Sequence, residues 1–401
     1  MAIHYIDELT EELKDKVVIA RFDFNVPLDK SDRSKITDTT RIDMALETIQ
    51  YLLDNGVKKL ILMSHLGRPK GEVNEDYSLE PVASHLAEKL KEDVLLTESC
   101  LDRGIKTLLG LNESRVILLQ NLRFHPEEEA GAPEFARSLA SYADIYVNDA
   151  FGVAHRKHAS AYIINAYFKK KAYAGFLMKR EIEALLKITN KPKTPFVAIV
   201  GGAKVSDKIK IIERLIVNVD HLIIGGAMAY PFLAAKGHQV ADSLCSDADI
   251  ALAKRILMSS SKSKVILPID HIVSSEFGGA PEICEKVDIP EGKMGLDIGP
   301  KTIDLYNQKL AGAATVLWNG PMGLFENEDF SKGTLAIAKT LSRMENAFTL
   351  VGGGDSVSAV QKAGLASKMS HVSTGGGASL EFIEEGSLPG IQALKFGLDL
   401  N

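Results

Sequence analysis

Hydrophobic and polar positions follow one another along the chain in a regular order of short apolar runs and longer helical patterns. The apolar runs are rich in β-branched residues and end at Gly, Pro, Asn or a charged residue, as buried strands do. The segments between them carry apolar residues at the spacing of amphipathic helices. This order is typical of repeated βα units, and it predicts an α/β fold with parallel sheets.

Both halves of the chain show this order. Strands of the first half are predicted in KVVIARFDFNVP, KKLILMSHLGRP, RVILLQNLRFHP and ADIYVNDAFG, with helices such as Arg41–Leu53 and Leu79–Leu90 between them. Strands of the second half are predicted in PFVAIVGGAKVSDK, HLIIGGAMAY, VILPIDHIV, ATVLWNGPMGLFE and AFTLVGGGDS, with helices such as Lys208–Val217 and Lys332–Met344. The halves share the order of their elements but no clear repeat of residues. We therefore expect two sheets of similar size.

The segment GFLMKREIEALLKITNKPKTP lies between the two halves, and its helical pattern stops before Pro192 and Pro195. A chain of 401 residues exceeds the roughly 250 to 300 residues at which single hydrophobic cores stop growing. We therefore predict an N-terminal domain over residues 1–178, a hinge helix over 179–190 and a C-terminal domain over 191–385. The alternative is one large domain in which this segment is an ordinary surface helix.

The composition and the first residues of the chain indicate the compartment in which the protein is expected. Hydrophobic residues make up 45% of the chain and charged residues 25%, which is the ordinary mixture for a globular protein. The first residues carry acids and lysines where a signal peptide needs an apolar stretch, and no apolar run approaches the roughly 20 residues of a membrane helix. The three cysteines are too far apart for a zinc motif and are expected to be reduced thiols. We therefore expect a cytoplasmic protein without a membrane segment.

Polar residues gather directly after the apolar runs of the first half, where open α/β sheets bind their ligands. Each of the four strand ends supplies an arginine, namely Arg21, Arg68, Arg123 and Arg156, and nearby residues include Asp23, Asn25, His65, His125, His155 and His158. Guanidinium groups bind phosphate and carboxylate through paired hydrogen bonds. The repetition predicts an anion site, whereas any one of these arginines alone would more often be a solvated surface charge. The histidines of HRKH lack a settled metal geometry and are expected to add donors to this site.

Net charge restricts the partners of such a site. The formal net charge is −6, which argues against nonspecific binding to nucleic acid because such binding needs a cationic surface. A local basic site for a small anion remains compatible with this value.

Glycine-rich turns take the place of arginines in the second half. GGAKVSDK puts Gly201 and Gly202 between a strand and a helix, where bare amides and a helix N-terminus can bind phosphate oxygens. Lys204 and Lys208 add positive charge. The sequence is not a Walker A loop, because no GK[ST] closes it. The alternative is a glycine pair that only allows tight packing.

VGGGDS repeats the same arrangement and adds Asp355, a hard oxygen ligand suited to Mg²⁺. It does not fit the dinucleotide pattern GxGxxG, because Val357 stands where the third glycine should be. The alternative role of Asp355 is a helix cap. In WNGPMGLFE, Glu326 either accepts hydrogen bonds from ribose hydroxyls or faces water on a packed loop, and spacing alone favours the second interpretation.

Taken together, RFDFNVP, SHLGRP, NLRFHPEE, AHRKHAS, GGAKVSDK, WNGPMGLFE, VGGGDS and STGGGASLEF resemble the ordered signature of the phosphoglycerate kinases. The resemblance runs from Arg21 to EEGSLPGIQAL, which is essentially the whole chain. It implies two Rossmann-like domains joined by a helix hinge, with residues 386–401 packing back on the N-terminal domain. It also implies the glycolytic transfer of a phosphoryl group from 1,3-bisphosphoglycerate to Mg-ADP, giving 3-phosphoglycerate and ATP, by a monomer.

The resemblance assigns roles to individual residues. Asp23 and Asn25 would hold the glycerate hydroxyl and carboxylate, and the residues around its 3-phosphate would be Arg41, His65, Arg68, Arg123 and Arg156. The phosphoryl group in flight would be surrounded by Arg21, Lys204, Gly353 and Gly354. The implied nucleotide contacts are Gly202, Lys208, Gly295, Asn319, Glu326, Gly353, Gly354, Asp355 and Ser356, with Lys208 at the phosphates, Asn319 and Glu326 by the adenosine, and Asp355 on Mg²⁺.

Two other classes share some of these features. A nicotinamide-dependent dehydrogenase would have an α/β fold and glycine turns, but the chain lacks its fingerprint. A non-catalytic nucleotide-binding or scaffold protein would have no use for four strand ends that carry arginines. Formation of ATP from the acyl phosphate separates the three classes.

Overall fold

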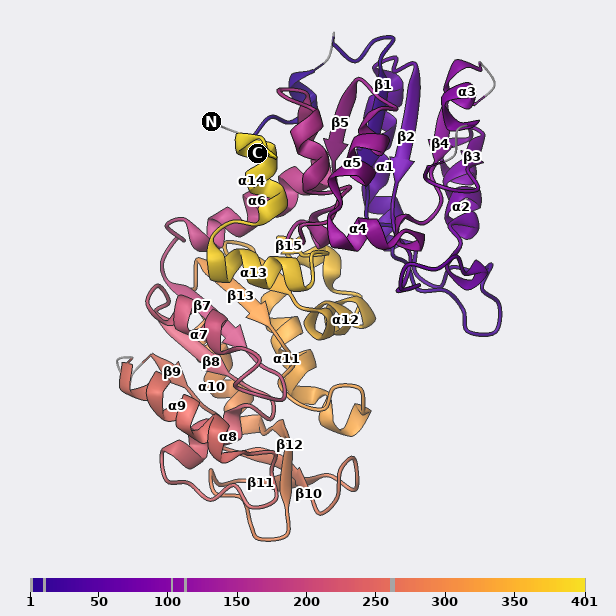
Figure 1. Cartoon of the computed structure of the whole chain (residues 1–401). Helices are drawn as coiled ribbons and strands as arrows, with labels where there is room; N and C mark the ends of the chain where they lie inside the picture. The colour runs from indigo at the N-terminus through magenta and orange to yellow at the C-terminus, as the bar shows by residue number, and fades with distance from the viewer. Residues whose placement is uncertain (1–2, 10–11, 102–103, 112–113, 260–263, 401) are drawn as a thin grey trace. The chain divides into compact units, whose positions relative to one another are not determined.

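The computed structural model describes residues 3–9, 12–101, 104–111, 114–259 and 264–400 (Figure 1). The chain forms two compact units, which we term unit 1 (Met1–Glu183 with Ser387–Asn401) and unit 2 (Ala184–Gly386). Helix α6 (Phe176–Thr189) carries the chain from unit 1 into unit 2 and begins earlier than the hinge helix expected over 179–190. The division at Glu183 falls within this helix.

Unit 1 contains a six-stranded parallel sheet in the order β3-β4-β2-β1-β5-β6. Its strands are β1 (Val17–Arg21), β2 (Lys59–Met63), β3 (Val94–Leu96), β4 (Val116–Leu118), β5 (Ile145–Asn148) and β6 (Ala172–Ala174). Its α-helices are α1 (Thr40–Asp54), α2 (Glu80–Leu90), α3 (Gly104–Gly110), α4 (Pro126–Ala130), α5 (Pro133–Ala140) and α14 (Pro389–Phe396). Short 3₁₀ turns cover Ile6–Glu8, Glu75–Tyr77, Leu122–Phe124, Phe151–Val153 and Ile163–Tyr167.

Unit 2 contains a second six-stranded parallel sheet, in the order β15-β14-β13-β7-β8-β9, and a small antiparallel sheet, in the order β11-β10-β12. The strands are β7 (Phe196–Val200), β8 (His221–Ile224), β9 (Val265–Ile266), β10 (His271–Ser274), β11 (Glu282–Cys284), β12 (Met294–Ile298), β13 (Thr315–Asn319), β14 (Phe348–Gly352) and β15 (His371–Val372). The helices are α7 (Ile209–Ile216), α8 (Ala229–Ala235), α9 (Asp247–Ser259), α10 (Pro300–Leu310), α11 (Lys332–Leu341), α12 (Gly354–Lys362) and α13 (Gly377–Glu385), with 3₁₀ turns at Glu328–Phe330 and Ala366–Lys368.

The central strands are nearly continuous apolar runs because both faces of each parallel sheet are covered. Every residue of β2, β7 and β13 is buried, as is every residue of β1 except Val17. These strands build separate cores, one around Phe22, Leu60 and Val147 in unit 1 and one around Val197 and Trp318 in unit 2. The prediction of two sheets of similar size is confirmed, since each parallel sheet has six strands.

Strand order determines where a ligand site is expected in each unit. In unit 2 the chain runs outward from β7 through β8 to β9 on one side and through β13, β14 and β15 on the other. This is the doubly wound order, and its switch point lies between β7 and β13. In unit 1 the corresponding switch point lies between β1 and β5, where Arg21 is in register with Asn148. Ligands bind outside the carboxyl ends of the strands at such points.

The prediction of one strand in VILPIDHIV is wrong. Val265–Ile266 pairs with β8 in the parallel sheet, whereas His271–Ser274 belongs to the antiparallel sheet. Pro268 between them lacks an N–H for a ladder hydrogen bond. Asp270 then turns the chain, because its carboxylate accepts hydrogen bonds from the backbone of Thr302 at 2.7 Å and of Lys301 at 2.9 Å in the first turn of α10.

The C-terminal segment belongs to unit 1, as the family resemblance implies. Helix α14, yellow in Figure 1, contacts β6, and Gly390 N donates a hydrogen bond to Ala154 O at 2.8 Å. A Cβ at Gly390 would lie 3.1 Å from this carbonyl oxygen, so the close approach of the two backbones favours glycine. Within the described part of the chain, no helix has the length and apolar character needed to cross a membrane.

Candidate functional site

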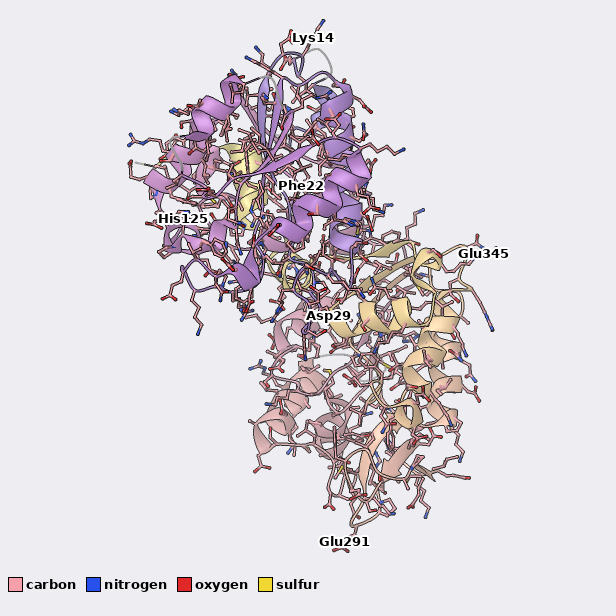
Figure 2. All side chains as sticks on the ribbon, turned by 90° about the vertical axis from the view of Figure 1, so that its right-hand side faces the viewer. Lys14, Phe22, Asp29, His125, Glu291 and Glu345 are labelled. Atoms are coloured by element: carbon pink, nitrogen blue, oxygen red, sulfur yellow. The ribbon has the colours of Figure 1, made fainter. Side chains whose placement is uncertain are left out.

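Arg21 lies at the end of β1 and is buried, with 1% of its surface exposed. Its Nε donates a hydrogen bond to Ser160 Oγ at 2.9 Å, its Nη1 donates to Phe22 O, and its Nη2 lies 3.1 Å from His65 Nδ1. Phe22, labelled in Figure 2, stacks on Phe24 with ring centroids 5.4 Å apart. The two buried rings of RFDF therefore anchor the backbone on either side of Asp23.

Asp23 and Asn25 tie together the loops that follow β1 and β2. Asp23 Oδ2 accepts a hydrogen bond from Arg41 Nη1 at 2.7 Å, and Asp23 Oδ1 accepts one from Asn25 N at 3.2 Å. Asn25 Oδ1 in turn accepts from Gly67 N at 2.8 Å. The start of α1 and two strand ends are thus joined by side chains to which the resemblance assigns contacts with the glycerate.

Arg123 joins the same group from the turn after β4. Its Nη1 donates to Gly67 O at 2.9 Å and its Nε lies 3.1 Å from Glu129 Oε1. Burial lowers the pKa of Arg123, and the neighbouring Arg21 acts in the same direction. Arg156 also acts electrostatically on Arg123, although its side chain is exposed. Arg68 directly follows Gly67 and is exposed.

We term these residues the unit 1 basic cluster: Arg21, Asp23, Asn25, Arg41, His65, Arg68, Arg123 and Arg156. Contacts among Arg21, His65 and Asp23, and through Gly67, bring together the members that are buried or half-buried. Arg68 and Arg156 add cationic groups at the exposed edge. The structure therefore brings the inner members of this set together, and the anion site that the four arginines predict stays a prediction.

Two buried histidines of this region, His65 and His158, report on its electrostatic environment. Burial lowers the pKa of His65 well below its ordinary value, and Arg21, Arg123 and Arg41 lower it further. Burial and the same kind of neighbours lower the pKa of His158 to about 3. Both imidazoles are therefore neutral at neutral pH, because burial, and then the arginines around them, disfavour a positive charge on the rings. An anion would relieve this repulsion.

His155 and His158 of HRKH belong to the described residues. In the ranges that the structure describes, no group of three or more His, Cys, Asp or Glu side chains is arranged to hold a metal ion.

Unit 2 contains a cavity of about 460 Å³ at the carboxyl ends of its central strands. Polar and glycine residues that line it include Gly202, Gly226, Asp242, Gly295, Gly323, Glu326 and Asp355. Its apolar lining includes Leu244, Phe277, Met294, Leu296, Pro321 and Leu324. Phe277 and Leu244 are 73% and 55% exposed, so the cavity presents uncovered apolar surface to a flat ligand.

Three strand ends approach one another closely beside this cavity. Gly201 N donates to Asn319 O at 2.9 Å, and a Cβ at Gly201 would lie 2.0 Å from Pro321 O. Gly226 N donates to Met322 O at 3.0 Å. The glycines after β7 and β8 therefore allow the backbones to pack at the switch point. Tight packing, the alternative interpretation of Gly201, is thus one of its roles.

Lys208 and Asn319 form a pair behind the glycine turns. Lys208 Nζ donates to Asn319 Oδ1 at 2.6 Å, and burial lowers the pKa of Lys208. A Cβ at Gly353 would lie 2.7 Å from Asn319 Nδ2, so Asn319 faces the first turn of α12. Asn319 is fully buried and is not among the residues that line the cavity. The structure therefore puts it beside the glycine turns, whereas the resemblance implies a place by the adenosine.

Some of the remaining predicted nucleotide residues line the cavity, and the others do not. Gly202, Gly295, Glu326 and Asp355 line the cavity. Ser356 is buried, and its Oγ accepts a hydrogen bond from Gly320 N at 2.6 Å, which holds the turn after β13 against α12. Lys204 is exposed on the loop after β7, and Gly354 is exposed at the start of α12.

Comparison with known proteins agrees with this geometry. The sequence model of the family described as phosphoglycerate kinase matches residues 6–386. The chain belongs to the phosphoglycerate kinase family. It is 52% identical to the phosphoglycerate kinase of Anaeromyxobacter dehalogenans, covering 98% of this chain and 100% of the relative. It is 50% identical to that of Moorella thermoacetica, covering 96% and 97%.

Solved structures of the family have the same fold. The phosphoglycerate kinase of Coxiella burnetii matches with a TM-score of 0.88 at 38% identity, covering 98% of this chain and 99% of that one. The enzyme of Pyrococcus horikoshii matches with a TM-score of 0.81 at 30% identity, covering 98% of both chains. The resemblance stated from the motifs is therefore confirmed over the whole chain, and the protein is a kinase.

The sequence did not single out Glu128, Ser160, Leu244 or Phe277. Glu128 and Ser160 lie inside NLRFHPEEE and AHRKHAS, but nothing in the spacing shows that they meet Arg21. Leu244 and Phe277 lie in loops, where an apolar residue gives no periodic signal. Only the tertiary contacts reveal these four residues.

Proposed function

We propose that unit 1 binds the phosphoglycerate and unit 2 binds the adenine nucleotide in the reaction of this family. That reaction is phosphoryl transfer between 1,3-bisphosphoglycerate and ADP, giving 3-phosphoglycerate and ATP. The observation that carries the assignment is the separation of chemistry between the units. Unit 1 gathers arginines and neutral histidines, whereas unit 2 holds a cavity lined by glycines and apolar side chains.

The basic cluster suits a small, highly charged acid. Arg41, Arg68, Arg123 and Arg156 supply planar donors for the 3-phosphate, and His65 adds a neutral ring beside them. Asp23 and Asn25 are the acceptors that a glycerate hydroxyl needs. We assign these residues to the glycerate because its phosphate needs cationic donors and its hydroxyl needs an acceptor, and this one site offers both.

The cavity of unit 2 suits a nucleotide. Its apolar lining would contact the base, and Glu326 would accept hydrogen bonds from ribose hydroxyls. The amides of the glycine turns and the N-terminus of α12 would bind phosphate oxygens, with Lys208 and Lys204 as cations. We place Asn319 at the phosphate side, because it contacts Lys208 and lies beside Gly353.

Mg²⁺ fits the carboxylate of Asp355. Asp355 is exposed, lines the cavity and lies in the first turn of α12, next to the proposed phosphate position. One carboxylate together with phosphate oxygens and water is a usual coordination for this ion. When bound, it would neutralise charge on the nucleotide phosphates.

Phosphoryl transfer to ADP requires no nucleophile from the protein. An oxygen of the ADP β-phosphate attacks the phosphorus of the acyl phosphate and forms a new P–O bond. The bond between this phosphorus and the carboxyl oxygen breaks, and 3-phosphoglycerate leaves as a carboxylate. Catalysis then depends on positioning and on charge stabilisation. We propose that Arg21, Lys204, Gly353 and Gly354 contact the transferred group.

Three finer features complete the proposal. We propose that α6 is the hinge of the enzyme, that the enzyme works as a monomer, and that it works in the cytoplasm. These features rest on the resemblance and on the composition of the chain. Its substrates are small molecules.

Measuring ATP formation from 1,3-bisphosphoglycerate and Mg-ADP tests the proposal. Arg21→Ala should lower kcat by at least about 10²-fold, since comparable arginines in phosphoryl transfer contribute about 10³ to 10⁵. Arg68→Ala, the control, should mainly raise KM for the glycerate, as expected for ground-state binding. Identical kinetic profiles of the two variants would refute the division of roles, and absence of ATP from the wild-type enzyme would refute the function.

A further inference from the structure

Another cavity, of about 540 Å³, lies in unit 1, and we term it the unit 1 cavity. It is lined by His4, by residues between Asn165 and Tyr173 at β6, and by residues 393–399 at the end of α14 and beyond it. Figure 1 shows α14, in yellow, beside the N-terminal part of the chain. None of these lining residues belongs to the unit 1 basic cluster or lines the unit 2 cavity. The unit 1 cavity is therefore separate from both proposed substrate sites.

Aromatic rings form a large part of this lining. Phe168 and Tyr173 are nearly buried, whereas Phe396 at the end of α14 is 59% exposed. The Tyr173 hydroxyl donates a hydrogen bond to Lys170 O at 3.3 Å, which ties the ring to the turn that carries Lys170. Pairs of aromatic rings gain stabilisation beyond the area that they bury. The lining therefore favours a ligand that is itself aromatic.

Three lysines line the same cavity without an acidic partner. Lys169, Lys170 and Lys395 are exposed, and in the part of the chain that the structure describes no salt bridge within 4.0 Å includes any of them. Lys395 Nζ instead lies 5.1 Å from the centroid of the Phe396 ring. Among the lining residues only Asp399 is acidic. Positive charge therefore prevails, and the cavity suits an anion.

Asn165 adds a hydrogen-bond acceptor to the lining. It is 2% exposed, and its Nδ2 donates to Tyr162 O at 2.9 Å and to Ala161 O at 3.3 Å. Because both partners are carbonyl oxygens, the orientation of the amide is fixed and Oδ1 is the remaining acceptor. Among the described residues, Oδ1 has no hydrogen-bond partner. Buried acceptors are normally paired, so Oδ1 favours a ligand that brings an N–H or O–H group.

From these observations we propose that the unit 1 cavity binds a small aromatic anion whose ring carries an N–H or O–H donor. The ring would contact Tyr173 and Phe396, the donor would bind Asn165 Oδ1, and a carboxylate or phosphate would lie among the lysines. A fatty acid fits less well, because its alkyl chain offers no donor to Asn165. The volume of the cavity is within the range of small-molecule sites.

Calorimetric titration of the full chain with indole-3-acetate tests the proposal, and 1-naphthaleneacetate is the matched ligand. Both are bicyclic aromatic acetates, but only the indole carries an N–H. Indole-3-acetate should bind with a Kd below about 1 mM. The naphthalene should bind at least about threefold more weakly, because it cannot make the hydrogen bond to Asn165. Uridine monophosphate also combines a ring N–H with an anion, so its binding shows whether the cavity takes a nucleotide as well as an aromatic acid.

Variants of the lining show where the ligand binds. Lys395→Glu and Lys169→Glu should each lower the affinity by about threefold to tenfold, and Phe396→Ala by a similar factor. Lys171→Glu is the matched control, because Lys171 is exposed and follows Lys170 in the chain but does not line the cavity. It should leave the affinity unchanged. Thermal unfolding confirms that each variant is folded, and Lys169→Glu decides the question if Lys395→Glu does not fold.

Three results would count against the proposal. Absence of binding by both N–H ligands would overturn it, and so would equal affinity of the wild type and the three lining variants, because the probe would then bind elsewhere. Equal affinity for the two acetates would overturn the hydrogen bond to Asn165 and with it the donor on the ligand. No lining residue is assigned to the kinase reaction, so any of these results leaves ATP formation intact and is distinguishable from failure of the proposed function.

Discussion

Gly354→Ala should make the enzyme more stable and less active. Gly354 is the first residue of α12, and a Cβ at this position would meet no atom within 4 Å. Replacing such a glycine reduces the conformational entropy of the unfolded chain and stabilises a protein by about 0.4 to 1 kcal/mol. For a unit of this size, that gain raises the midpoint of thermal unfolding by about 1 to 4 °C.

The loss of activity has a different cause. The new methyl group would occupy the space that we assign to the nucleotide phosphates at the start of α12. We expect ADP affinity to fall by about tenfold or more, since phosphate oxygens would be displaced from the backbone amides. Gain of stability with loss of binding is a combination that damage to the fold cannot produce.

Two neighbouring glycines provide the comparison. Gly353 has φ +85°, and its Cβ would lie 2.7 Å from Asn319 Nδ2, so Gly353→Ala should lower both stability and nucleotide affinity. Gly364, just beyond the other end of α12, has φ +66°, and a methyl group there would meet no atom within 4 Å. Gly364→Ala should therefore cost about 1 to 2 kcal/mol through strain alone and leave ADP binding unchanged.

Calorimetric titration with Mg-ADP, turnover measurements and thermal unfolding test these expectations together. A lower unfolding midpoint for Gly354→Ala would contradict the free space around this residue. Wild-type ADP affinity and turnover in that variant would remove Gly354 from the phosphate site.

Three other predictions follow from single side chains. Asp355→Asn should weaken Mg²⁺-dependent turnover without changing 3-phosphoglycerate binding, and unaltered Mg²⁺ dependence in activity assays would contradict a metal role. Because the folded-state pKa values of His65 and His158 lie below their ordinary value of 6.5, the contribution of these two histidines to the unfolding free energy should fall as pH drops below about 6.5. Thermal unfolding should show a smaller fall with 3-phosphoglycerate bound, and an equal fall would contradict an anion beside these rings. Burial raises the pKa of Asp297 from 3.8 to about 7, so the folded state binds more protons and the contribution of Asp297 to stability should decrease from about pH 4 to pH 7, opposite to that of the histidines. The difference in stability between the wild type and Asp297→Asn, measured by urea unfolding, should therefore change over this window.

Much of the fold could be predicted from the sequence because strands that are covered on both faces must be apolar throughout. The runs VVIA, LILM and FVAIV can be recognised without knowledge of their neighbours. The residues that end or follow such runs lie at the carboxyl edge of a parallel sheet, so Arg21, His65 and Gly201 could be placed at this edge from their position alone. Each of these features depends only on neighbouring residues, so it can be recognised from a short stretch of the sequence.

Short and irregular elements could not be predicted. Strands β3, β6 and β15 contain only two or three residues each, which is too short for a periodic pattern. Strand β10 does not belong to the parallel sheet, because Pro268 and the turn at Asp270 separate it from β9. The apolar wall formed by Leu244 and Phe277 comes from loops, where side-chain polarity follows no period.

The sequence by itself therefore determined the class of fold, the positions of the main strands and the chemical types at their ends. Tertiary structure alone decided which of these residues touch. The contacts of Ser160 with Arg21 and Glu128 span 139 and 32 positions of the chain, and the pair of Lys208 and Asn319 spans 111. Strand order brings such distant residues together, and it depends on the packing of the complete sheets, which no local pattern contains.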